Sequence, residues 1–187
     1  LSDLGGAGTQ TAAIAFSGNP PTGTPTGGQT ELYNGTNWTE VNDYLGTNIY
    51  DPGSAGTQTS ALGFAGGAAP VRVNTELWNG TNWTEVNNMN SSRGGGICSA
   101  GASNTSALAA GGLTGSSPYN SALTELWNGT NWTETADLNQ ARTALNGCGI
   151  QTAALAIGGR IVSGTPLSAL TELWNGSSWT EVNDTNT

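Results

Sequence analysis

Paired carboxylates are the feature of this sequence that could most readily do chemistry. Eight of the thirteen acidic residues form four pairs, and the two glutamates of each pair are nine residues apart. Two carboxylates could serve as a general acid and a general base. An active site does not need four identical copies, so we interpret the pairs as solvated charges on outer strands, where they discourage edge-to-edge association. The pairs are Glu31 and Glu40, Glu76 and Glu85, Glu125 and Glu134, and Glu172 and Glu181.

Other catalytic residue types are missing. The chain contains no histidine and its four basic residues are all arginines, so it has no imidazole base or metal ligand and no lysine nucleophile. The net charge of −9 argues against a nucleic-acid partner, which requires clustered basic residues. The apolar runs fall far short of the roughly 18 residues of a membrane span. We therefore predict a soluble non-enzyme with no cofactor, no metal site and no membrane insertion.

The two cysteines do not occupy equivalent positions in the sequence pattern. Cys98 and Cys148 each lie among small apolar residues, in which a free cysteine behaves as a small hydrophobic residue. We predict two buried free thiols. A Cys98–Cys148 disulfide is the alternative, and it would indicate an oxidising compartment.

The chain is built from four tandem units. The phrase Thr-Glu-Leu-Trp-Asn-Gly-Thr-Asn-Trp-Thr-Glu-Val covers residues 75–86 and recurs, with small variations, at 30–41, 124–135 and 171–182. The second tryptophans of the four copies are 45, 49 and 47 residues apart. A second phrase, Gln-Thr-Ala-Ala or a close variant, precedes each copy. Such a period is typical of propeller blades.

Each unit predicts four antiparallel strands and almost no helix. A glycine-rich stretch leads into a short apolar run, and the twelve-residue phrase then forms a β-hairpin, because Asn-Gly accepts the positive φ angles of a tight turn. Alternation places Glu76, Trp78, Trp83 and Glu85 on one face of the hairpin. We predict an all-β propeller of four four-stranded blades in a single domain, 1–187, with approximate blade boundaries at 1–43, 44–88, 89–137 and 138–187.

Small residues in the innermost strands, as in Gly5-Gly6-Ala7-Gly8, allow close approach at the axis and favour a tight ring of four blades. Two chains that shared one ring would instead give an eight-bladed homo-oligomer. The sequence is also compatible with a segment of a longer protein.

Aromatic residues occupy two positions in every unit. Burial of a large aromatic side chain contributes about 1.5 to 3 kcal/mol, and small alanine-rich strands need bulky side chains to fill the wedge between blades. We therefore expect the second aromatic residue of each pair to pack between blades. The alternative is a lectin with one sugar-stacking site per blade. The pairs are Tyr33 and Trp38, Trp78 and Trp83, Trp127 and Trp132, and Trp174 and Trp179.

The order of a glycine-rich strand, an apolar strand ending in Gly-Gly and a hairpin with two aromatic residues resembles the kelch repeat over essentially the whole chain. The five-residue step from Trp78 to Trp83 is shorter than in typical kelch units, so the chain resembles a variant of that family. The copper-radical oxidases of kelch-like architecture need histidine ligands, which are missing here. The twelve-residue phrase is also similar to repeats in virion and tail-fibre-like proteins of marine bacteriophages, and this resemblance implies attachment at a virion or other extracellular surface.

The connections between the second and third strands differ among the units, whereas the turns at the opposite end are nearly identical. These connections span residues 19–29, 68–74, 113–123 and 160–170. Binding residues concentrate on loops held by a rigid scaffold, and Tyr and Arg combine contact area with directional hydrogen bonding. The candidate ligand-binding residues on this face are Tyr44, Tyr50, Arg72, Tyr119 and Arg160.

Three classes of function follow from these features. The first is a receptor-binding or adhesion module of a virion, such as a phage tail fibre, whose partner is a host surface receptor or glycan. The second is the lectin with aromatic sites repeated on each blade. The third is a structural decoration or fibre subunit that contacts other virion proteins.

Overall fold

The computed structural model describes residues 2–19, 28–46, 49–67, 70–161 and 167–186. This part of the chain contains 16 strands in four separate four-stranded antiparallel sheets and no helix. In every sheet the spatial order of the strands follows their order in the sequence. The prediction of an all-β propeller with four four-stranded blades is confirmed. Parts of three of the variable connections lie outside the described residues.

The strands are assigned to blades as follows. Blade 1 contains β1 (Gly5–Thr9), β2 (Ala12–Phe16), β3 (Thr30–Tyr33) and β4 (Trp38–Val41). Blade 2 contains β5 (Gly53–Thr57), β6 (Ser60–Phe64), β7 (Thr75–Trp78) and β8 (Trp83–Glu85). Blade 3 contains β9 (Cys98–Ser103), β10 (Ser106–Ala110), β11 (Thr124–Trp127) and β12 (Trp132–Glu134). Blade 4 contains β13 (Asn146–Ile150), β14 (Ala153–Ile157), β15 (Thr171–Trp174) and β16 (Trp179–Val182).

The hairpin of the twelve-residue phrase has the predicted faces. In blade 2, Trp78 pairs with Trp83 and Glu76 pairs with Glu85 across β7 and β8. The turn has four residues, and the side-chain oxygen of Asn79 accepts hydrogen bonds of 2.9 Å from the backbone N–H groups of Thr81 and Asn82. Gly80 has a φ of 93°, which explains why glycine follows asparagine in every copy.

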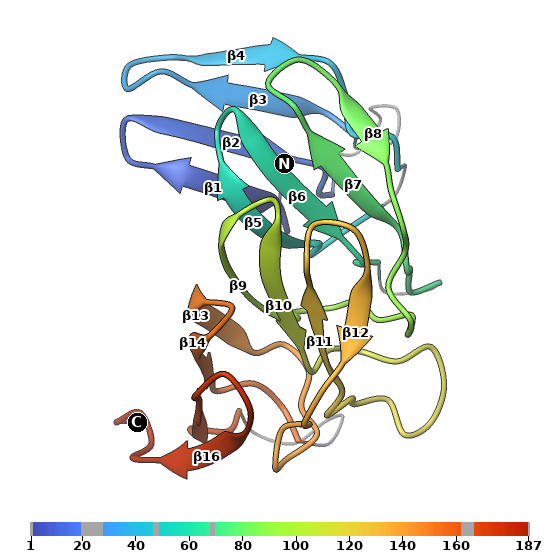
Figure 1. Cartoon of the computed structure of the whole chain (residues 1–187), viewed down its shortest axis with the longest axis vertical. Helices are drawn as coiled ribbons and strands as arrows, with labels where there is room; N and C mark the ends of the chain where they lie inside the picture. Colours follow the sequence, from blue (N-terminus) through green and yellow to red (C-terminus); the bar gives the residue numbers. More distant parts are fainter. Residues whose placement is uncertain (1, 20–27, 47–48, 68–69, 162–166, 187) are drawn as a thin grey trace.

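The innermost strands of consecutive blades lie side by side, in the order β1, β5, β9 and β13. All four contribute residues to one axial cavity of about 300 Å³. Small side chains are required here, because a Cβ atom on Gly101 would lie 2.8 Å from the Cβ atom of Ala55. Figure 1 shows the blades following one another along an arc, from β1–β4 at the top to β13–β16 at the bottom.

The hydrophobic core consists of three clusters, one between each pair of consecutive blades. Each blade has an outgoing face, which meets the next blade, and an incoming face, which meets the preceding one. In the first cluster the outgoing face of blade 1 supplies Ile14 and Phe16, and the incoming face of blade 2 supplies Ala61, Trp78 and Trp83. Packing between blades therefore buries the apolar residues of the repeat.

The two terminal blades do not cover one another. Trp38 on the incoming face of blade 1 is 50% exposed, whereas its equivalents Trp83, Trp132 and Trp179 are 4%, 5% and 6% exposed. Leu173 on the outgoing face of blade 4 is 41% exposed. The expectation of a tight ring that the four blades close among themselves is therefore wrong for the described residues, and Trp38 is an exception to the predicted packing.

Both cysteines are free, but only one is buried as predicted. Cys98 is buried between blades 3 and 4, whereas Cys148 is exposed. Cys148 pairs with Leu155 in blade 4, and this position is occupied by alanine in the other blades. Its exposure has the same cause as that of Leu173, because no further blade covers the outgoing face of blade 4.

Candidate functional site

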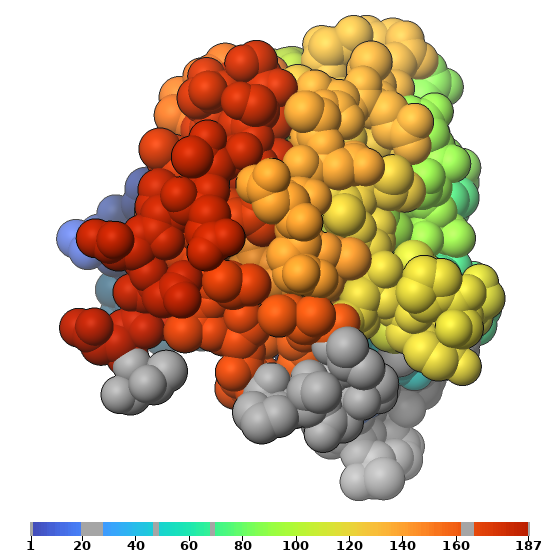
Figure 2. Space-filling view, turned by 90° about the horizontal axis from the view of Figure 1, so that it is seen from below, coloured from blue at the N-terminus to red at the C-terminus, as the bar shows by residue number. Residues whose placement is uncertain are grey.

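The connection between β10 and β11 projects from the loop end of blade 3. It folds back on itself, because the backbone N–H of Thr114 donates a hydrogen bond of 2.9 Å to the carbonyl of Tyr119, and Leu113 forms a bridge with Asn120. This turn presents the Tyr119 ring to solvent, where it is 54% exposed. Figure 2 shows the loop in yellow at the lower right, standing out from the body of the molecule.

Asn120 joins this loop to the neighbouring loop of blade 4. Its side-chain amide donates a hydrogen bond of 3.0 Å to the carbonyl of Arg160 and a second one to the carbonyl of Ile161. The backbone N–H of Arg160 is in turn bonded to the carbonyl of Thr143 at 2.7 Å. Tyr119 and Arg160, both predicted as binding residues, are therefore brought together on adjacent, anchored segments, and both are exposed.

Blade 2 extends this surface. The backbone N–H of Arg72 donates to the carbonyl of Gly66 at 3.1 Å, and that of Gly67 donates to the carbonyl of Tyr50 at 2.7 Å. Arg72 and Tyr50 are both partly buried, so they are less available to a ligand than Tyr119. The side chain of Val71 lies against Gly115 in the blade 3 loop. We call the residues Val71, Arg72, Tyr119, Asn120, Arg160 and Ile161 the loop surface.

Within the described residues, the loop surface contains both arginines that lie outside ion pairs. The chain has a net charge of −9 and four arginines. Two of these arginines, Arg93 and Arg142, are buried in ion pairs. The other two, Arg72 and Arg160, form no ion pair within the described residues, and both belong to the loop surface. A ligand at this surface would meet the exposed Arg160 and Tyr119, whereas Arg72 is partly buried and lines a separate hollow with Gly46, Ile49 and Asn74.

Tyr44 does not belong to the binding face, and this prediction is wrong. Its side chain is buried, stacks on Phe16 with ring centroids 5.3 Å apart and meets the edge of Trp83 at 4.9 Å. Burial is the main reason that the pKa of its phenol lies well above the ordinary value, and the nearby carboxylate of Glu76 adds to that shift. Tyr44 lies in the segment that links β4 to β5, and packing of this segment turns its ring into the wedge between blades 1 and 2.

The interpretation of the paired glutamates as solvated charge is wrong for one member of three pairs. Glu76, Glu125 and Glu172 are buried, whereas the second members Glu85, Glu134 and Glu181 are exposed as predicted. The buried glutamates lie on the third strands of blades 2, 3 and 4. Each one lies against the segment that connects the last strand of the preceding blade to the first strand of its own blade. Their carboxylates accept hydrogen bonds from that segment. They therefore fasten consecutive blades together.

Two of these glutamates are neutralised by arginines that the sequence analysis did not single out as functional. Arg93 donates to Glu125 at 2.9 Å and Arg142 donates to Glu172 at 2.8 Å. Burial lowers the pKa of the Arg93 guanidinium, and the charge of Glu125 partly offsets this effect. The sequence does contain a signal for these ion pairs. Each arginine follows the second tryptophan of a copy, Trp83 or Trp132, by ten residues.

Within the described residues, Glu76 has no arginine partner. Its carboxylate accepts hydrogen bonds of 2.8 Å and 3.1 Å from the backbone N–H groups of Leu45 and Gly46. Burial raises the pKa of Glu76 to about 7, against the lowering effect of these two hydrogen bonds and with a further rise from the charge of Glu85. The equivalent position in the linking segment, ten residues after Trp38, is an asparagine.

The aromatic residues of blades 2 to 4 are structural, as expected for the second member of each pair. The indole N–H groups of Trp83, Trp132 and Trp179 donate to threonine hydroxyls of the preceding blade. The first tryptophans, Trp78, Trp127 and Trp174, are fully buried. Their indole N–H groups donate to carbonyls in the turn between the first and second strands of their own blade. Sugar-stacking sites repeated on every blade are therefore not available. Only Tyr33 and Trp38 of blade 1, with ring centroids 5.1 Å apart, remain accessible.

The described residues contain no group of three histidine, cysteine, aspartate or glutamate side chains that could hold a metal ion. In the same part of the chain, no helix is long and apolar enough to cross a membrane.

Comparison with known proteins identifies the fold. No family model matches the chain, and no curated protein matches it either. Among solved structures, the chain is similar to YjhT, a kelch-type β-propeller, with a TM-score of 0.80 and 11% sequence identity. The match covers 100% of this chain and 66% of that chain, so the present sequence spans about two thirds of the length of YjhT. At this identity the likeness establishes the propeller fold alone.

Proposed function

We propose that the chain is a non-enzymatic attachment module, and that it binds a receptor or glycan on a host surface through the loop surface. The observation that carries this proposal is that Tyr119 and Arg160 are both exposed, on two segments that the Asn120 side chain joins. Tyrosine and arginine are enriched among the residues that dominate binding energies, because each offers a large contact area with directional hydrogen bonds. The blades supply the rigid scaffold on which such loops gain specificity.

The charge of the surface indicates the chemistry of the ligand. Arg72 and Arg160 have no acidic partner in the described residues, while the remainder of the chain is strongly acidic. Guanidinium groups recognise carboxylates and phosphates through paired, directional hydrogen bonds. We therefore propose a ligand that carries anionic groups together with hydroxyl or apolar surface, such as an acidic glycan or an acidic protein loop at the cell surface.

The virion setting rests on a different observation. The repeated phrase Thr-Glu-Leu-Trp-Asn-Gly-Thr-Asn-Trp-Thr-Glu is similar to repeats in virion and tail-fibre-like proteins of marine bacteriophages. We place the chain at a virion or other extracellular surface on this basis. The absence of histidine and lysine from the sequence supports the non-enzymatic part of the proposal, because the usual general base and amine nucleophile are missing.

A cell-binding assay tests the attachment role. The fluorescently labelled chain is incubated with a panel of intact marine bacteria, and binding is compared with that of the Tyr119→Ala/Arg160→Ala variant. A control variant, Thr133→Ala/Glu134→Ala, truncates two exposed residues on the outer strand β12. We expect binding that the first variant reduces at least about tenfold and the control leaves unchanged. Equal binding by all three proteins, or no binding to any strain, would contradict the proposal.

A further inference from the structure

The three interfaces between blades follow one hydrogen-bonding rule. The indole N–H of the incoming tryptophan donates to the hydroxyl of a threonine on the outgoing face of the preceding blade. The three bonds join Trp83 to Thr30 at 2.9 Å, Trp132 to Thr75 at 2.9 Å and Trp179 to Thr124 at 3.0 Å. Around each bond, the outgoing face supplies aliphatic or small residues, with Phe16 in blade 1 and Phe64 in blade 2, and the incoming face supplies the tryptophan pair.

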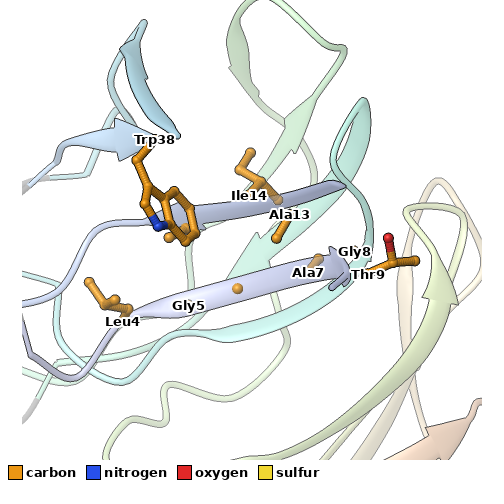
Figure 3. A pocket seen from close by; sticks show the side chains of 10 residues that line it. Leu4, Gly5, Ala7, Gly8, Thr9, Ala13, Ile14 and Trp38 are labelled. Atoms are coloured by element: carbon orange, nitrogen blue, oxygen red, sulfur yellow. The ribbon is translucent and has the colours of Figure 1, made fainter. Parts of the chain in front are cut away.

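In the part of the chain that the structure describes, blade 1 has the incoming half of this interface without a partner. Trp38 projects over a groove of about 390 Å³ that is lined by Leu4, Ala13 and Ala15. Figure 3 shows the Trp38 ring above β2, with Leu4 at one end of the groove. In blades 2, 3 and 4 the corresponding surface is covered by the preceding blade. Glu31, the first glutamate of this copy, is only partly buried, unlike its three equivalents.

Among the described residues, nothing covers the outgoing half of the interface on blade 4. The hydroxyl of Thr171 makes only a long contact of 3.4 Å with the carbonyl of Ala169, in place of the indole that its equivalents receive. Leu155 is partly exposed, whereas the equivalent residues of the other blades, Ile14, Leu62 and Leu108, are fully buried. Exposed apolar side chains continue across this face at Ile150, Leu173 and Val182.

The polar residues that form hydrogen bonds between the edges of consecutive blades also occur on the two uncovered faces, those of blade 1 and blade 4. Asn42 and Asn87 donate from the outgoing edge to the hairpin turn of the next blade, and Asn183 occupies the same place after β16. Gln58 and Gln151 donate from the incoming edge to carbonyls of the preceding blade, and the equivalent residue of blade 1 is Gln10. Asn183 and Gln10 are both exposed. Each terminal face therefore has the same residue types that form hydrogen bonds between blades at the interfaces inside the chain.

We infer that the two terminal faces bind a pair of further blades of this same repeat, and that these blades complete the ring. The pair would offer a threonine-bearing outgoing face to Trp38 and a tryptophan-bearing incoming face to Thr171. The number follows from the comparison: the match covers 66% of the YjhT chain, and the uncovered remainder has the length of about two blades of this size. A second whole copy would bring four blades, twice that number. The inference is independent of the proposed ligand.

A six-bladed chain tests this inference. The chain's own blades 2 and 3, residues 44–137, are joined after residue 187, so that the added blade 3 can present its copy of Thr124 to Trp38. A second version carries the same segment before residue 1. We expect at least one version to melt at a higher temperature than the native chain. In that version Trp38→Ala lowers the melting temperature by at least about 6 °C, against less than about 2 °C in the native chain.

Matched variants of the added segment assign the effect to the new interface. Replacement of the added copy of Thr124 by valine removes the hydroxyl that Trp38 would reach, and we expect it to reverse part of the gain in melting temperature. Replacement of the added copy of Thr133 by alanine alters an exposed position of the same blade, and we expect no change. These two substitutions distinguish docking at Trp38 from the general effect of a longer chain.

Three results would overturn the inference. The first is that both six-bladed versions melt no higher than the native chain. The second is that the native chain forms dimers at micromolar concentration that Trp38→Ala dissociates, because the occupant would then be a second copy. The third is glycan-array binding that Trp38→Ala abolishes, because the groove would then be a sugar site.

Discussion

The guanidinium of Arg93 donates to the carboxylate of Glu125 at 2.9 Å, and neither side chain is exposed to solvent. The same guanidinium also donates to the carbonyls of Gly111, which follows β10, and Leu123, which precedes β11. Glu125 in turn accepts from the backbone N–H of Asn90 in the linking segment. One ion pair therefore fastens the link between blades 2 and 3 to the third strand of blade 3.

We predict that Arg93→Met destabilises the chain by about 3 to 5 kcal/mol, because it leaves the Glu125 carboxylate buried without a compensating charge. The double variant Arg93→Met/Glu125→Met should lose less than the sum of the two single variants, since both charges are then removed. Urea unfolding followed by circular dichroism provides the four free energies of the cycle. Additive losses would show that the two side chains are not coupled.

We predict that Glu76 makes the stability of the chain depend on pH. Its pKa is raised from an ordinary value of 4.5 to about 7 in the folded chain, so folding favours the protonated carboxyl group. Its contribution to stability is therefore greatest below pH 4.5, decreases between pH 4.5 and 7 and is constant above that range. The difference in unfolding free energy between Glu76→Gln and the native chain should shift in favour of the variant as the pH rises from 5 to 8. An identical difference at both pH values would contradict this account.

We predict that equivalent tryptophans have unequal effects on stability. Trp83→Ala should cost about 3 to 5 kcal/mol, because it opens a cavity against Phe16 and leaves the hydroxyl of Thr30 without its indole donor. Trp38→Ala should cost less than about 1 kcal/mol, because half of that side chain is already in solvent. Urea denaturation of the two variants measures the difference, and equal losses would mean that Trp38 is packed like the others.

We predict that the two thiols react at very different rates. Burial raises the pKa of Cys98 to about 12, so almost no thiolate forms at neutral pH, whereas Cys148 is exposed at the open face of blade 4. A chromogenic disulfide reagent should titrate one thiol per native chain and two in denaturant. Cys148→Ser should abolish the native reaction, and a remaining fast reaction would place Cys98 at the surface.

The repeat period was sufficient to predict most of the fold, because the sequence of each unit contains the signals for its own strands and turns. The Asn79-Gly80 turn and the alternation from Glu76 to Trp78 were sufficient to predict the hairpin and its two faces. The sequence could not reveal which face would be covered, because coverage depends on the neighbouring blade. Trp38 and Trp83 occupy the same place in the repeat, yet only Trp83 has a blade in front of it.

The candidate site was predicted only in part, for a related reason. Tyr119 and Arg160 were identified from residue type and from the variability of their loops, and the structure brings them together through Asn120. Tyr44 was identified by the same argument, but the linking segment turns its ring into the wedge beside Phe16. Local sequence does not distinguish these outcomes, because the direction of a side chain in a linking segment is set by packing against residues far away in the sequence.

Acrylamide quenching of tryptophan fluorescence tests the stacked, open arrangement of blades most directly. The account predicts that the native chain has one accessible tryptophan among seven, and that Trp38→Phe removes the quenchable fraction without changing the rest. If no tryptophan were accessible, the four blades would close on themselves. If several remained accessible after the substitution, the blades would not pack against one another, and the propeller account would be wrong.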